Sequence, residues 1–203
     1  MTISYPLSLP STGVTKVTFN NSHAVSIVES PYTYISQTQV HPGQRWSASI
    51  EMPTLSRSDA EQWQCFLLQL NGRAGTFYLT DPLHPSPIGN WSGTPMIDGA
   101  GQSGQTLNIK GLAVGATIAP GDMFQIGTRL YKHIGLSTVV ADGSGKATID
   151  IWPRLRTPSP GNNDPIITES PAGIFRLSQN ESELFSTVAL EYYQITLDAI
   201  EAL

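Results

Sequence analysis

The chain has 203 residues, of which 13% are charged, and its net charge is −5. This length suffices for one large β domain or two small ones, and the ordinary apolar share of 39% excludes a disordered chain. A single cysteine excludes an intramolecular disulfide. No segment has the ~18 consecutive apolar residues of a membrane helix. The first residues lack the basic and apolar regions of a signal peptide, so we expect none.

The low charge content has two interpretations. One is a plain β-rich globular protein, and the other is a subunit whose surface is largely covered by neighbours, since interface cores are depleted in charge. Residues 161–203 hold seven acidic side chains and one basic side chain, and the rest of the chain is nearly neutral. Because no basic stripe is present, a nucleic-acid-binding groove is not expected.

The first part of the chain predicts strands. Enrichment in β-branched residues and partial alternation place them over residues 14–19, 23–28, 34–40 and 46–50. We expect the third strand to end at His41-Pro42-Gly43 and the fourth to end before Pro53.

One helix is predicted after these strands. Ser58 and Glu61 have capping-box spacing, and Ser56 is a rival N-cap. A single apolar stripe then follows at helical spacing: Trp63, Phe66, Leu67 and Leu70. Asn71-Gly72 is typical of a helix end. The stripe could dock a partner, but packing against the protein's own sheet is the favoured interpretation.

A proline-rich run, residues 81–87, cannot continue a strand and indicates a domain boundary. A second β region follows. Its expected strands cover residues 107–109, 122–126, 129–134, 137–141 and 147–152. Two hairpin turns are predicted within it, at Gly127-Thr128 and at residues 142–146. The last predicted strands cover residues 165–168, 173–177 and 186–197.

A short repeat suggests how these regions combine. Residues 74–79 and 172–177 share the pattern A-G-x-F-x-L and flank the middle region. We therefore predict a mainly β protein with two parts. Residues 1–85 together with 164–203 should form a β-sandwich-like domain carrying the helix, and residues 86–163 should form a separate, inserted, OB-like small β-barrel.

Motifs that resemble catalytic or cofactor sites lack the context that their chemistry needs. Residues 99–104 match G-x-G-x-x-G, with Asp122 about 20 residues on, but strand or loop rather than a helix is expected after the glycines. Residues 143–147 resemble a phosphate loop but lack its first glycine and its Ser/Thr. Cys65 is interpreted as a buried helix residue. We therefore predict no catalytic, cofactor-binding or metal site, and no enzyme.

The four histidines, His23, His41, His84 and His133, have no partner at metal-ligand spacing, so each is interpreted as a surface or core residue. Paired carboxylates assembled by folding remain open as an alternative, and with them a carbohydrate hydrolase.

Several long stretches resemble a family of siphophage tail-tip proteins. These are residues 45–53, the helix with Glu61-Gln62-Trp63, residues 70–79, residues 119–131, residues 141–148 and the close of the chain from residue 173. The nearest role within that family is the distal tail protein. The resemblance implies β-sandwich subunits that close into a ring beneath the tail tube, with an extra β module pointing outward.

The resemblance also implies partners and a location. We expect a homo-oligomeric ring, sixfold by resemblance, that contacts the tail tube protein, the hub or fibre-bearing tip proteins and the tape measure protein. The protein would reside in the virion tail tip and, during assembly, in the host cytoplasm. DNA would pass the lumen without specific binding, and acids of residues 161–203 facing the lumen would repel it.

Two other functions stay open. The chain could be another tail fitting, or an accessory module that binds carbohydrate on the host surface. For the second, four aromatic side chains of the inserted module could stack on sugars: Trp91, Phe124, Tyr131 and Trp152. The same four residues could equally form the core of the module.

Overall fold

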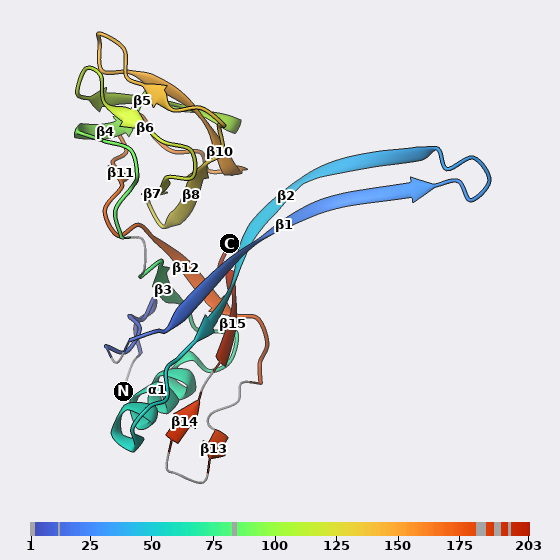
Figure 1. Cartoon of the computed structure of the whole chain (residues 1–203), viewed down its shortest axis with the longest axis vertical. Helices are drawn as coiled ribbons and strands as arrows, with labels where there is room; N and C mark the ends of the chain where they lie inside the picture. Colours follow the sequence, from blue (N-terminus) through green and yellow to red (C-terminus); the bar gives the residue numbers. More distant parts are fainter. Residues whose placement is uncertain (1–2, 12, 83–84, 182–185, 189–191, 195) are drawn as a thin grey trace.

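The computed structural model describes residues 3–11, 13–82, 85–181, 186–188, 192–194 and 196–203, with the backbone alone in the two ranges between 186 and 194. The fold is mainly β with one helix, as predicted. In Figure 1 a barrel-like body lies at the top, a sheet with the helix lies below it, and a long hairpin projects to the side.

The lower body contains a five-stranded antiparallel sheet in the order β1-β2-β15-β12-β3. Its strands are β1 (Lys16–Glu29), β2 (Ser36–Glu51), β3 (Phe77–Thr80), β12 (Ala172–Leu177) and β15 (Thr196–Glu201). The first and last segments of the chain therefore share one sheet. The two A-G-x-F-x-L repeats form the neighbouring strands β3 and β12, in which Phe77 lies opposite Phe175.

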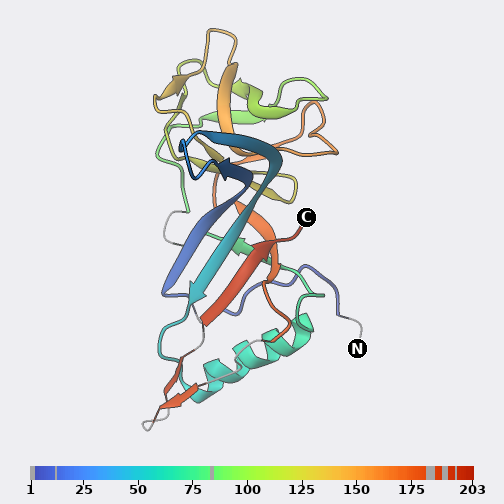
Figure 2. The same ribbon diagram turned by 90° about the vertical axis from the view of Figure 1, so that its right-hand side faces the viewer.

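Helix α1 (Arg57–Leu70) shares a core with this sheet and lies at the end of the sheet away from the barrel (Figures 1 and 2). Ser56, the rival cap, is the N-cap: its side chain accepts from the Asp59 amide, and Asn71 ends the helix in the left-handed region. The predicted stripe is buried against sheet residues such as Ile50 and Phe175. Packing on the protein's own sheet is thus confirmed for this stripe.

The four strands predicted before the helix form only two strands in the structure, and both are long. β1 and β2 pair from Lys16–Glu51 out to Glu29–Ser36, with a bulge where Ala24 faces residues 41–43. His41-Pro42-Gly43 therefore does not end the strand, contrary to the prediction. Pro42 is tolerated because a bulge residue makes no ladder hydrogen bond.

The upper body is a nearly closed barrel of six strands in the order β11-β7-β8-β10-β5-β4. Its strands are β4 (Gly93–Ile97), β5 (Gly104–Leu112), β7 (Met123–Ile126), β8 (Arg129–His133), β10 (Ala147–Leu155) and β11 (Ile166–Ile167). Ile97 closes the ring of strands: its amide donates to the Asp164 carbonyl and its carbonyl accepts from the Asn163 amide, both at 3.0 Å.

Two small pairs complete the structure. β6 (Thr117–Ile118) pairs with β9 (Val139–Val140), and β13 (Ser186–Val188) pairs with β14 (Tyr192–Gln194). The turn predicted at residues 142–146 is present, but β9 and β10 on its two sides do not pair with each other, contrary to the predicted hairpin. The strand predicted over residues 186–197 is divided among β13, β14 and the start of β15.

The barrel extends beyond the predicted boundary at residue 163, because β11 pairs with β7 and Ile166 is buried in the barrel core. The barrel is also joined to the lower body through its side chains. Leu130 and Trp152 come from barrel strands but are buried in the core of the five-stranded sheet. Removing the barrel would take both side chains out of that core.

We expect Trp63→Ala to lower the free energy of unfolding by about 3–5 kcal/mol, because Trp63 is fully buried and truncation leaves a cavity. Thermal or denaturant unfolding measures this loss. Leu68→Ala is the matched control on the same helix, where 64% of the Leu68 surface is exposed. A loss for Trp63→Ala no larger than that for Leu68→Ala would contradict the packing.

Candidate interaction surface

The most unusual feature of the molecule is the projecting hairpin, residues 20–44, which we call the arm. It is built from the outer parts of β1 and β2, and Figure 1 shows it leaving the body without a covering layer. Almost all of its side chains are exposed. An exposed two-stranded hairpin is at best marginally stable alone, so this one needs either a firm base or a cover.

The two faces of the arm differ in chemistry. Strand alternation and the observed register put Val25 beside Val40 and Ile27 beside Thr38 on one face, which we call the apolar arm face. The opposite face carries Ser26, Val28, Gln37 and Gln39. Ile27 is 64% exposed and Val40 is 73% exposed. In a sheet of this kind an apolar face normally lies against a core.

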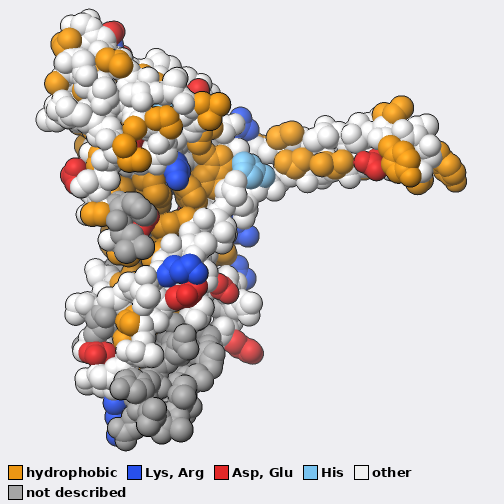
Figure 3. All heavy atoms as spheres, in the orientation of Figure 1, with side chains coloured by type: hydrophobic (Ala, Val, Ile, Leu, Met, Phe, Trp, Pro, Cys, Tyr) orange, Lys and Arg blue, Asp and Glu red, His pale blue; other side chains and the backbone are white. Residues whose placement is uncertain are grey.

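The apolar arm face continues the core face of the lower sheet. Val17 and Phe19 pack on the sheet's core, and alternation along β1 carries the same side of the strand out to Val25 and Ile27. The core itself stops at the arm base, where the His23 and Trp152 rings lie 5.5 Å apart. Hydrophobic side chains along the projecting hairpin are visible in Figure 3.

The tip of the arm is a turn with large apolar side chains. The Tyr34 amide donates to the Ser30 carbonyl at 2.9 Å, and the Ser30 amide donates to the Ile35 carbonyl at 3.1 Å. Tyr32, Tyr34 and Ile35 are all exposed by more than two thirds. With neutral histidines, Glu29 is the single charged residue between positions 20 and 44. Aromatic enrichment and charge depletion together are typical of an interface core.

The base of the arm is fixed by a polar junction. The Glu201 carboxylate, 5% exposed as a residue, accepts from the Trp46 amide at 3.1 Å and from the Arg156 guanidinium at 3.2 Å. Arg156 also donates to the Gln44 carbonyl, and the Gln44 side chain accepts from the Arg154 amide at 2.8 Å. Barrel, arm and C-terminal strand therefore meet at one point, which fixes the arm's direction.

A hollow beside the arm base, which we call the base groove, has an apolar lining with one charge. Its lining residues are Phe19, Asn21, Trp46, Lys132, Ile134 and Trp152. Lys132 also lines an adjoining hollow that contains Met123, Pro87 and Ile88, so the two hollows meet at Lys132. Within the described ranges, Lys132 makes no salt bridge, and neither does Glu29.

The glycine run does not have the structure of a dinucleotide site. Strand β5, not a helix, starts at Gly104, and the Gln102 side chain holds the loop by donating to the carbonyls of Asp98 and Asn108 at 3.0 Å. Asp122 stands at the distance expected of a ribose-binding acid, but its carboxylate already accepts hydrogen bonds from its own chain. It accepts from the Trp91 indole and the Ala119 amide at 2.8 Å, and from the Ile88 amide at 2.7 Å. This buried carboxylate therefore has a structural role, which the sequence did not predict.

The turn at residues 142–146 is held by its own side chains. Asp142 accepts from the amides of Ser144 and Lys146, and these hydrogen bonds hold the pKa of the Asp142 carboxyl below its ordinary value. The Lys146 ammonium lies 2.7 Å from Asp98, and this hydrogen bond lowers the pKa of Asp98, with Lys110 adding to the effect. Gly145 adopts φ +71°, and a Cβ there would meet the Leu112 carbonyl oxygen. No open phosphate cradle results.

The other candidate residues are not assembled into a site. His133 is buried, with Nδ1 2.8 Å from the Asp150 carbonyl, and His23 and His41 are exposed; His84 lies outside the described residues. Cys65 is exposed, contrary to the prediction, because it lies off the buried stripe of α1. In the part of the chain that the structure describes, no three His, Cys, Asp or Glu residues come together as metal ligands. No described helix is long and apolar enough to cross a membrane.

The four aromatic residues considered for sugar stacking are core residues. Trp91, Phe124, Tyr131 and Trp152 are each at most 6% exposed. Phe124 stacks with Tyr131 and lies beside Trp91, inside the barrel. None of them presents a ring face on which a sugar could stack.

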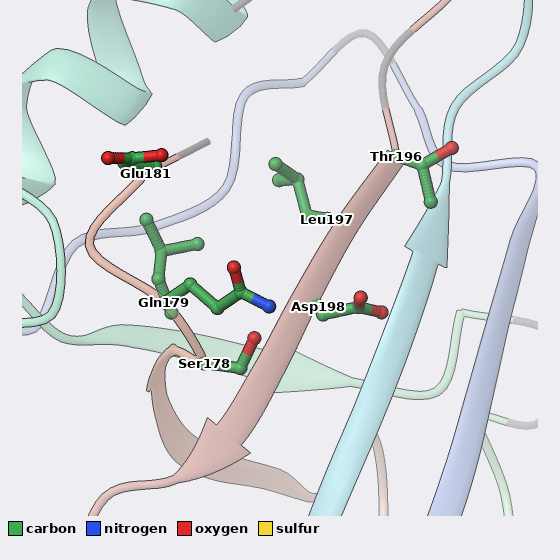
Figure 4. A pocket seen from close by; sticks show the side chains of 7 residues that line it. Ser178, Gln179, Glu181, Thr196, Leu197 and Asp198 are labelled. Atoms are coloured by element: carbon green, nitrogen blue, oxygen red, sulfur yellow. The ribbon is translucent and has the colours of Figure 1, made fainter. Parts of the chain in front are cut away.

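A polar pocket beside β15 holds the nearest approach to paired carboxylates. Its lining includes Glu181 and Asp198, with Gln179 between them in the close view of Figure 4. Glu181 lies on the connection that follows β12, and Asp198 lies on β15.

No protein-family model matches the chain, and no curated protein sequence matches it significantly. The arm and the base groove are therefore the features from which its function has to be inferred.

We expect the apolar arm face to contribute nothing to the stability of the isolated chain. Replacing Ile27 and Val40 together by Thr should change the free energy of unfolding by no more than about 0.5 kcal/mol, as for exposed positions in general. Ile50→Thr, on β2 like Val40 but inside the core, should cost at least about 2 kcal/mol. Melting at low protein concentration compares the two, and equal losses would place the arm face in a core.

The ion pair of Asp98 predicts acid sensitivity. Because its pKa in the folded state lies below the ordinary 3.8, its stabilising effect is present above that value and is lost as the pH falls through the folded-state pKa. Asp98→Asn should therefore lose less melting temperature between about pH 5 and pH 3 than the natural chain. Identical pH profiles would show that Lys146 gives Asp98 no stabilisation.

Proposed function

We propose that this chain is a structural subunit of a siphophage tail tip, a distal tail protein that forms a closed homo-oligomeric ring. The observation that carries the proposal is the arm: a long, charge-poor hairpin with an apolar face and an aromatic tip, fixed at its base and uncovered by its own chain. An exposed apolar patch of this extent marks a protein-interaction site.

The shape of the molecule favours a head-to-tail arrangement. The arm leaves the body on one side, so a neighbour that covers it uses a different surface of its own. Such a heterologous contact generates a ring when its rotation closes. The low charge content, 13%, suits a subunit with much of its surface covered. These observations support assembly, and the resemblance to tail-tip proteins supplies the tail tube, hub, fibre-bearing and tape measure proteins as its further partners.

Fewer acidic side chains of residues 161–203 are available to face a DNA-conducting lumen than the sequence suggested. Glu201 is buried in the junction with Arg156, Asp164 accepts from the Gly161 amide, and Glu169 accepts from Ser86. Glu183 and Glu191 lie outside the described residues. Glu181 and Asp198 line the polar pocket of Figure 4, so these two carboxylates are the described candidates for facing a lumen.

The proposal is tested by removing the arm. His23 lies opposite Gln44, so residues 24–43 can be replaced by Asn-Gly, a two-residue turn suited to this antiparallel pair. We expect the natural chain to form a ring by light scattering and negative-stain microscopy, and to occupy the tail tip in purified virions. The shortened chain should melt like the natural chain but remain monomeric.

Two results would contradict this function. One is absence of the protein from purified particles, and the other is a lone copy away from the tail axis. A monomer that binds glycans in solution would favour the carbohydrate-binding alternative, for which the buried aromatic residues give no support.

A further inference from the structure

Resting on the proposed ring, we infer that the surface receiving the arm is the base groove of the neighbouring copy, with Glu29 of one copy pairing with Lys132 of the next. Within one chain, neither the apolar arm face nor the base groove packs against a complementary surface of the described residues. One is an exposed apolar ridge, and the other is an apolar hollow lined by aromatic side chains.

The arm and the base groove are complementary in shape and polarity. The arm is a two-stranded ridge whose face carries β-branched side chains, and its tip adds Tyr32 and Tyr34. The base groove offers the partly buried Phe19 ring and the side chain of Ile134, which is 45% exposed, while the Trp46 and Trp152 rings that also line it are each only 6% exposed. In Figure 3 hydrophobic side chains gather in the angle beneath the barrel, next to the root of the arm. Aromatic residues in such hollows are typical energetic centres of interfaces.

The arm and the base groove also carry opposite charges. Glu29 is the one charged residue of the arm, and alternation places it on the same face as Val25 and Ile27. Lys132 is the one charged residue lining the base groove. Neither forms a salt bridge with any described residue, and their signs are opposite. A single charge without a salt bridge, on each of two surfaces with few other polar groups, specifies which surfaces meet and in what register.

The direction of the arm favours a second copy as the partner. The base groove adjoins the junction of Gln44, Arg156 and Glu201, which fixes the root of the same chain's arm. Since the arm extends away from that point, its outer part cannot fold back onto its own groove without breaking the β1–β2 ladder. A second copy is therefore the occupant that places an identical groove within reach of every arm. Each copy then gives one arm and receives one, as a closed ring requires.

Disulfide trapping tests the contact. In a Cys65→Ser background, Ile27→Cys protein is mixed with Ile134→Cys protein under mild oxidation. We expect a mixed dimer to form at least tenfold faster than with Val28→Cys, the control of similar exposure on the opposite arm face. Equal rates, or faster pairing of Ile27→Cys with itself, would overturn the inference.

Charge reversal tests the proposed pair. Glu29→Lys and Lys132→Glu should each weaken assembly at least about tenfold, because two like charges then meet in an apolar contact. The double variant should recover assembly to within about threefold of the natural chain. Rings that tolerate both single changes, or a double variant as weak as the single ones, would overturn the inference while leaving the proposed ring function intact. No ring and no protein in the virion would reject both.

Discussion

The contacts of Trp46 join the main parts of the structure to one another. Its ring lies in the core of the lower sheet and packs edge-on against Trp152, with ring centroids 4.3 Å apart. Its indole N–H donates to the Leu130 carbonyl of the barrel at 2.9 Å, and its backbone amide donates to the buried Glu201 carboxylate. One residue thus joins the sheet, the barrel and the C-terminal strand at the root of the arm.

This joint links the barrel and the lower body through a buried ion pair. A buried carboxylate is stable only when paired and hydrogen-bonded, and Glu201 obtains both from Arg156 and from the Trp46 amide. Arg156 follows β10 of the barrel, and Glu201 ends β15 of the sheet. The barrel therefore takes part in orienting the arm, which a freely tethered outer module could not do.

The fold class could be predicted from the sequence because local patterns and tertiary packing agree. The stripe of α1 is buried as its spacing predicts, and the repeated A-G-x-F-x-L segments are neighbouring strands. Predictions failed where a local signal had two structural uses. Pro42 ends a regular strand but fits a bulge, and Cys65 is apolar without lying on the buried stripe.

The candidate site was harder to predict, because an apolar face in sequence does not say which chain covers it. Residues 23–28 show the alternation of an ordinary core strand, yet their outer part lies beyond the core. Likewise Asp122 looks like any acid at a plausible distance from a glycine run. Its role depends on donors more than 30 positions away, Ile88 and Trp91, that only the fold brings to it.

The bulge at residues 41–43 has a consequence for the subunit before assembly. A free hairpin exposes rows of unpaired amides and carbonyls along its edges, and such edges recruit further strands into aggregates. Pro42 has no amide hydrogen, and the bulge breaks the regular spacing of the outer edge of β2. An incoming strand would lose its partners at that point. The apolar arm face thus remains available for binding, while the outer edge of β2 resists the addition of further strands.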